Sequence, residues 1–87
     1  MSIEKHKYTK IDAHSVVNQL RRRFDVGVGA YHEDSGQYRI DIETATDDIS
    51  YWMDERIWLV WPLKQSDLPF CGHGYLALFR WLDQGGD

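Results

Sequence analysis

The chain has 87 residues, a formal net charge of −4, 43% hydrophobic and 14% aromatic residues, and one cysteine, Cys71. This length and composition favour a single domain with its own core, and a lone cysteine excludes an internal disulfide. The main apolar run, residues 57–62, is far shorter than the roughly 20 residues that span a bilayer. Because the first ten residues also lack the apolar segment of a secretory signal, we expect a cytoplasmic protein.

Charge is distributed unevenly along the chain. Residues 1–24 carry six Lys or Arg and two acidic residues, whereas residues 25–55 carry nine acidic residues and one Arg. Residues 56–87 carry three of each sign. Such segregation bears on the partners of a protein and not on its fold.

The first predicted element is a helix. Residues 1–10 are polar and basic and are expected to be a flexible segment that precedes a single α+β domain of residues 11–87. Asp12 is predicted to be the N-cap, with Ile11 and Val16 as a hydrophobic staple. Apolar residues then recur at the spacings of three and four that are typical of an amphipathic helix, namely Ala13, Val16, Val17, Leu20 and Phe24.

A β-hairpin is predicted to follow the helix. Residues 25–32 alternate between apolar and small or polar side chains, and residues 34–36 form a turn that ends in Gly36. Gly27 and Gly29 leave a bare strand face, which indicates close approach of another element. Pairing Glu33 with Gln37 brings the apolar residues onto one face: His32 opposite Tyr38, Ala30 opposite Ile40 and Val28 opposite Ile42.

Residues 48–63 hold three of the four tryptophans and admit two interpretations. In the first, residues 49–53 pair with the strand around residues 57–61 through a tight turn at Asp54 and Glu55. In the second, a helix begins after Thr46. The aromatic and β-branched content favours the hairpin. Within it, Trp58 is expected in the core and Trp61, next to the strand-ending Pro62, nearer the surface.

A final helix is predicted to begin at Leu68 or nearer His73 and to end at Gly85. The fold class is therefore α+β: a four-stranded antiparallel meander with an N-terminal and a C-terminal helix packed on one face, in the order α-β-β-β-β-α. The helical interpretation of residues 47–56 gives the alternative order α-β-β-α-β-α.

No catalytic residue, metal ligand set or cofactor is predicted. Cys71 and His73 are separated by one residue, which is shorter than the spacing of paired zinc ligands, and no second cysteine exists. The same two residues lack a third group that would orient a nucleophile and its base. A small buried cysteine at a helix start is the expected role of Cys71.

The acidic side chains are the most distinctive feature. In the meander they lie on one sheet face and in the turns, where they attract basic surfaces. We expect a non-catalytic protein-binding domain, as a small inhibitor or adaptor of the mobile-element type; solvation alone and a homodimer seam are the alternatives. The predicted binding residues are Glu33, Asp34, Asp41, Glu43, Asp47, Asp48, Asp54, Glu55 and Trp61.

Basic side chains of the first helix support a second hypothesis, a small nucleic-acid-binding regulator. Its predicted contacts are Lys10, Arg21, Arg22 and Arg23. The element order resembles that of double-stranded RNA-binding domains. Their second helix presents a cluster of lysines to phosphate, where this chain has only Arg80, so nucleic acid is the less favoured partner.

Overall fold

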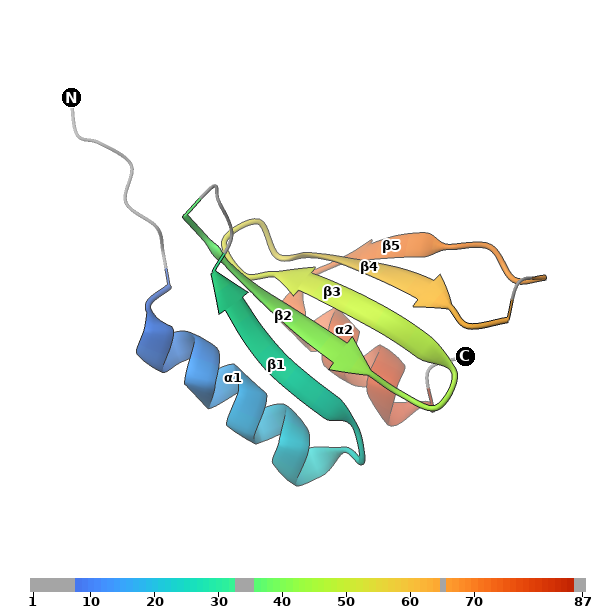
Figure 1. Ribbon diagram of the computed structural model, residues 1–87, viewed down its shortest axis with the longest axis horizontal. Coiled ribbons are helices and arrows are strands. Elements are labelled where there is room, and N and C mark those ends of the chain that lie inside the picture. Colours follow the sequence, from blue (N-terminus) through green and yellow to red (C-terminus); the bar gives the residue numbers. More distant parts are fainter. Residues whose placement is uncertain (1–7, 33–35, 65, 86–87) are drawn as a thin grey trace.

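A computed structural model of the chain describes residues 8–32, 36–64 and 66–85. Two helices lie against one antiparallel sheet, which confirms the predicted α+β class (Figure 1). The sheet order is the order of the strands along the chain. In chain order the elements are α1 (Lys10–Arg23), β1 (Gly27–His32), β2 (Tyr38–Glu43), β3 (Asp47–Trp52), β4 (Ile57–Pro62), β5 (Phe70–His73) and α2 (Tyr75–Asp83).

Helix α1 begins three residues earlier than an N-cap at Asp12 would require. Thr9 is the N-cap, because its Oγ1 accepts a hydrogen bond from the backbone N of Asp12 at 3.3 Å. The Asp12 carboxylate in turn accepts from the backbone N of Thr9 at 2.8 Å, which completes a capping box. Ile11 is 80% exposed, so the predicted staple is also wrong. Residues 1–7, most of the predicted flexible segment, lie outside the described residues.

The two predicted hairpins are present. Strands β1 and β2 pair with Val28 opposite Ile42 and Ala30 opposite Ile40, as the apolar pattern predicts. Strands β3 and β4 pair with Tyr51 opposite Trp58, so residues 47–56 are strand and turn and the helical alternative is wrong. The proposed pairing of Glu33 and most of the turn at 34–36 fall outside the described residues.

The predicted four-strand count is wrong, because residues 70–73 form a fifth strand. Strand β5 pairs with β4, and the ladder continues through the backbone N of Gly74, which donates to the Arg56 carbonyl at 2.7 Å. Gly74 has a φ of 99°, a conformation that glycine adopts without strain, and α2 begins at the next residue. The helix therefore starts at Tyr75 and not at Leu68.

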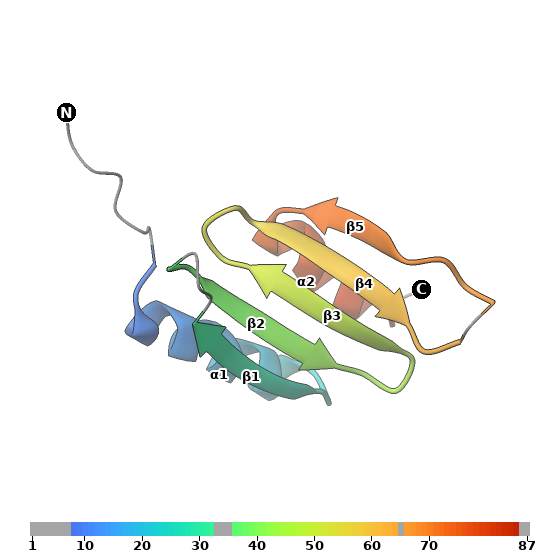
Figure 2. The same cartoon turned by 45° about the horizontal axis from the view of Figure 1, so that its top comes forward.

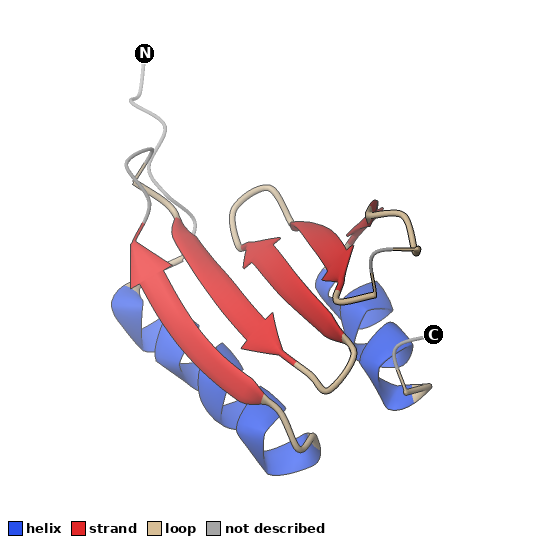
Figure 3. Cartoon of the chain, turned by 45° about the vertical axis from the view of Figure 1, so that its right-hand side comes forward, coloured by secondary structure: helices blue, strands red, loops and turns tan. Residues whose placement is uncertain are grey.

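Both helices lie on the same face of the sheet, one toward each edge (Figure 2). Figure 3 shows the same layering from the side. Helix α1 packs on β1 and β2, and α2 packs near β5. The apolar faces of helices and sheet share one core, which contains Ala13, Val17, Leu20, Val28, Ile40, Ile42, Ile49, Tyr51, Met53, Trp58, Val60, Leu78 and Leu82.

Trp58 joins β4, β5 and α2. Its indole lies against Gly72 of β5, where a Cβ would overlap the ring. The Trp58 Nε1 donates to the Gly74 carbonyl at 3.1 Å, and the ring lies 5.7 Å from that of Trp81 on α2. Trp58 is 5% exposed and Trp61 is 41% exposed, which confirms the prediction for both tryptophans.

Replacement of the two tryptophans should separate core from surface. Trp58→Ala is expected to lower the free energy of unfolding by about 3 to 5 kcal/mol, because it opens a cavity under β5 and removes the bond to Gly74. Trp61→Ala is the matched control and should lower it much less. Denaturant unfolding of both variants measures the difference. Equal large losses would mean that Trp61 is also a core residue.

The buried tyrosines should make stability fall at alkaline pH. Burial raises the pKa of Tyr51 to about 12, with a smaller contribution from Tyr8, and burial also raises the pKa of Tyr75. Between the ordinary tyrosine pKa of about 10 and pH 12 the unfolded chain loses the Tyr51 proton first. The free energy of unfolding should therefore decrease as pH rises through this window.

Tyr51→Phe should flatten that decrease, with Tyr31→Phe, at an exposed ring, as the matched control. Urea titrations at several pH values between 9 and 12 measure the slope for each protein. A slope that Tyr51→Phe leaves unchanged would contradict the assignment to Tyr51.

Candidate functional site

Neither of the two described helices lies over one face of the sheet, which we call the open face (Figure 2). Side chains alternate across a strand, so the residues that do not point into the core point to this face. The strand registers align them in rows that run from β1 to β5. They are Gly27, Gly29, Tyr31, Arg39, Asp41, Glu43, Asp48, Ser50, Trp52, Ile57, Leu59, Trp61, Cys71 and His73.

One row of the open face brings two carboxylates and a tryptophan together. Glu43 of β2 lies opposite Asp48 of β3, and Asp48 lies opposite Trp61 of β4. All three side chains are exposed. We call Glu43, Asp48 and Trp61 the acid-tryptophan row.

The two carboxylates of this row occupy a close pair. The Met53 backbone N donates to the Tyr38 carbonyl in the β2–β3 ladder, so alternation makes Glu43 and Asp48 a pair without mutual backbone hydrogen bonds. In such pairs the facing side chains are nearest, and like charges directly opposite destabilise the sheet. The row therefore concentrates negative charge beside an exposed indole.

A second predicted acid, Asp41, is already neutralised. Arg39 donates to both carboxylate oxygens, from Nε at 2.8 Å and from Nη2 at 3.0 Å. The Ser50 hydroxyl donates to the same carboxylate at 3.1 Å. The Arg39 guanidinium also lies 5.5 Å from the ring centre of Tyr31. Asp41 thus anchors a polar network on the open face and does not add to its uncompensated charge.

The β4 and β5 side of the open face is apolar. Trp61 is 41% exposed and Ile57 is 38% exposed. A hollow of about 290 Å³ lies at the Trp61 end of β4 and β5, lined by Leu59, Val60, Trp61, Pro69, Phe70 and Cys71. Phe70, opposite Val60, is 41% exposed at the helix side of the β5 edge. Ile57 and Phe70 were not predicted to be surface residues. The alternation along β4 was a usable signal for Ile57, whereas β5 was interpreted as helix.

The other predicted acids do not join the acid-tryptophan row. Asp47 is 2% exposed, and its carboxylate accepts from the Thr46 hydroxyl at 2.6 Å inside the β2–β3 turn. It therefore does not present its carboxylate to a partner, which corrects its inclusion in the binding set. Asp54 and Glu55 lie in the β3–β4 turn, at the opposite end of β3 from Asp48. Glu33 and Asp34 lie outside the described residues.

The basic residues of α1 do not form one patch. The Arg21 Nη2 donates to the Val28 carbonyl at 2.8 Å, and Arg23 forms an ion pair with Asp83 of α2 at 3.1 Å. Lys10 is the first residue of α1, about 18 Å along the axis from the last turn by helix geometry. Within the described ranges Arg22 has no side-chain partner.

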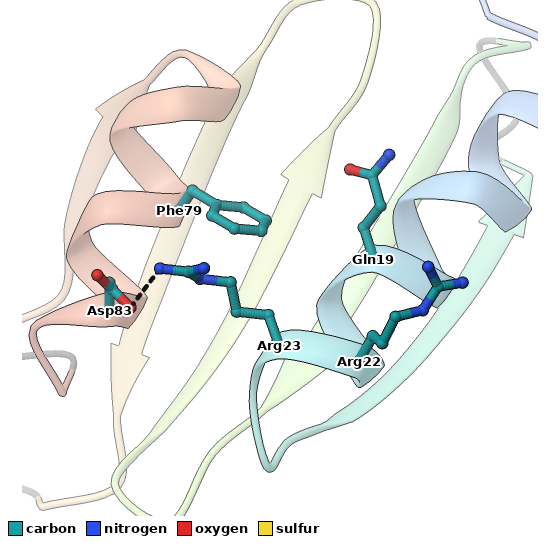
Figure 4. Close-up of a pocket in the computed structure, with 5 residues that line it drawn as sticks. All are labelled: Gln19, Arg22, Arg23, Phe79 and Asp83. Carbon is teal, nitrogen blue, oxygen red and sulfur yellow. Dashed lines mark hydrogen bonds and ion pairs between the residues drawn. The ribbon is translucent and has the colours of Figure 1, made fainter.

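A groove of about 570 Å³ runs between the two helices, lined by Gln19, Arg22, Arg23, Phe79 and Asp83. Figure 4 shows Arg23 extending across it toward Asp83, while Arg22 turns away from α2. The Arg23 guanidinium lies 5.6 Å from the ring centre of Phe79. Arg23 therefore acts as a bridge between the helices, and its charge is compensated by Asp83.

Among the described residues, no group of three or more His, Cys, Asp or Glu side chains is close enough to hold a metal ion. Neither described helix has the length and apolarity needed to cross a membrane. Comparison of the chain with protein-family models, with curated proteins and with solved structures found no match in any of the three.

Proposed function

We propose that this protein is a non-catalytic protein-binding domain that recognises a basic partner with the open face of its sheet. The observation that carries the proposal is the acid-tryptophan row, in which Asp48 lies between Glu43 and Trp61 on neighbouring strands. Of the nine predicted binding residues, these three form the proposed contact surface. The apolar side of the open face lies beside them.

The chemistry of the row fits an arginine-bearing surface. A guanidinium stacks on an aromatic ring and pairs with a carboxylate through two hydrogen bonds, and an indole beside two carboxylates offers both contacts. A cation placed there also relieves the repulsion between Glu43 and Asp48. The apolar hollow next to Trp61 supplies surface that is buried when the partner covers it.

The nucleic-acid hypothesis has less support. Its predicted contacts Arg21 and Arg23 are engaged with Val28 and Asp83, and the face opposite the helices carries the uncompensated acids. Phosphate binding depends on clustered basic charge, which would have to come from Arg22 and from residues at the distant start of α1. A small inhibitor or adaptor in the cytoplasm remains the concrete form of the proposal, and that form stays a prediction.

The test compares two variants with the same change in net charge. The partner is first captured from a lysate of the source cell with the immobilised protein and identified. We expect Glu43→Gln with Asp48→Asn to weaken binding of that partner at least about tenfold and to reduce the salt dependence of association, because the neutralised row no longer attracts or pairs with cations. Trp61→Ala should weaken binding as well.

Glu55→Gln with Asp83→Asn is the matched control, since both of these side chains are exposed and lie away from the row, Glu55 at the other end of β3 and Asp83 on α2 at the helix side of the sheet. Surface plasmon resonance between about 50 and 500 mM salt, a range over which the screening length falls below 10 Å, measures all variants. If the control pair weakens binding as much as the row pair, only net charge matters and the proposed site is wrong. Binding that is indifferent to both pairs contradicts an acidic recognition surface altogether.

A further inference from the structure

The two edge strands of the sheet, β1 and β5, differ in the contacts that they receive from the rest of the fold. Beside β1 lies α1, and Arg21 donates from Nη2 to the Val28 carbonyl of that edge strand. Among the described strands, β4 alone pairs with β5, and Phe70, Cys71 and His73 are exposed. The expectation that Cys71 is buried at a helix start is therefore wrong. Unpaired edge groups are a template for another strand, and within the part of the chain that the structure describes a side chain binds the β1 edge but none binds the β5 edge.

The ladder identifies which groups of β5 face outward. The Gly74 N donates to the Arg56 carbonyl, so in this antiparallel register the next bonded positions are Gly72 with Trp58 and Phe70 with Val60. The backbone N–H and C=O of Cys71 and His73 then point away from β4. No hydrogen bond to these four groups comes from the described part of the chain.

We propose that a second copy of this chain pairs with this edge, β5 against β5 in antiparallel orientation, with Gly72 opposite the Gly72 of the other copy. In this register each Cys71 faces a His73, and all four outward groups of each copy are bonded. In the register with Cys71 opposite the Cys71 of the other copy, Pro69 lies opposite His73, and proline has no N–H to donate. A shift that centres the pair on His73 brings in Tyr75, which is helical.

Charge favours a second copy at this edge. Residues 56–87 carry equal numbers of acidic and basic residues, although the chain has a net charge of −4. With strands about 4.8 Å apart, the two copies of Asp48 on β3 are roughly 24 Å from each other across the joined sheet, beyond the screening length of about 8 Å at physiological salt. Self-association through β5 therefore keeps the uncompensated acids apart.

The pairing also brings the apolar parts of the two open faces together. Leu59, Trp61 and Cys71 lie near the β5 edge, and the two acids of the row lie farther from it. In the joined sheet Leu59 and Cys71 of both copies flank the two His73 side chains at the centre, with one acid-tryptophan row on each side. This proposal concerns the edge and does not depend on the proposed partner of the open face.

The experiment is sedimentation equilibrium of the full chain under reducing conditions, from about 10 µM to about 1 mM, the range expected for a small interface. We expect a concentration-dependent dimer for the wild type. Cys71→Pro should be monomeric over this range, because the lost N–H faces outward and the β4 ladder is kept. Cys71→Ser keeps the N–H and should dimerise like the wild type, and circular dichroism should show that both variants are folded.

A monomeric wild type at 1 mM overturns the proposal and leaves the edge to a strand of another protein. A dimer that persists in folded Cys71→Pro also overturns it, since the contact is then elsewhere. The register has its own readout: in His73→Cys the introduced thiol faces Cys71 of the other copy at a Cα separation of about 5.5 Å, within disulfide range. Oxidation should give a covalent dimer for His73→Cys and not for the wild type, and the reverse result refutes the register.

Discussion

The contact between the Trp58 indole and Gly72 holds the C-terminal third of the molecule in place. The ring occupies the space that a side chain at position 72 would need, and its Nε1 reaches the Gly74 carbonyl at the turn into α2. Through this one residue of β4, the strand β5 and the helix that follows are both tied to the sheet. Trp81 and Phe70 also pack against this indole and add to the contact between β4, β5 and α2.

The orientation of Trp58 also determines which side chains of β4 lie on the open face. Because Trp58 points to the helices, the alternation of β4 sends Ile57, Leu59 and Trp61 to the other face. The apolar hollow and the indole of the acid-tryptophan row therefore follow from the same register that builds the core. The proposed binding surface and the core thus lie on the two faces of β4, and a shift of its register by one residue would exchange them.

Much of the fold could be predicted from sequence because apolar alternation is clear in the first three strands. The facing of Ala30 with Ile40 followed from that alternation, and the facing of Tyr51 with Trp58 followed from the predicted tight turn at Asp54 and Glu55. Strand β5 could not be recognised in the same way. It has four residues, one of them glycine, and its reason for being a strand is the indole of Trp58, which lies 14 positions before Gly72 in the chain.

The binding surface was predicted less well, because charge along a sequence does not say which side chains are already paired. Asp41 and Asp47 have the same sequence character as Asp48, yet Arg39 neutralises the first and the β2–β3 turn buries the second. Contacts also distinguish the three arginines of α1: Arg21 binds the Val28 carbonyl and Arg23 pairs with Asp83, whereas Arg22 has no side-chain partner among the described residues. Only the register between strands brings Glu43, Asp48 and Trp61 into one row.

The importance of the Trp58–Gly72 contact is tested most directly by the free energy of unfolding of Gly72→Ala, compared with that of Gly29→Ala. At position 29 the atoms nearest to an added Cβ belong to the ring of Tyr31, an exposed side chain that can move. At position 72 it would overlap the buried indole, so the account predicts a loss of about 1 to 3 kcal/mol or more for Gly72→Ala and a much smaller change for Gly29→Ala. A Gly72→Ala protein as stable as Gly29→Ala would contradict the central place given to the Trp58 contact.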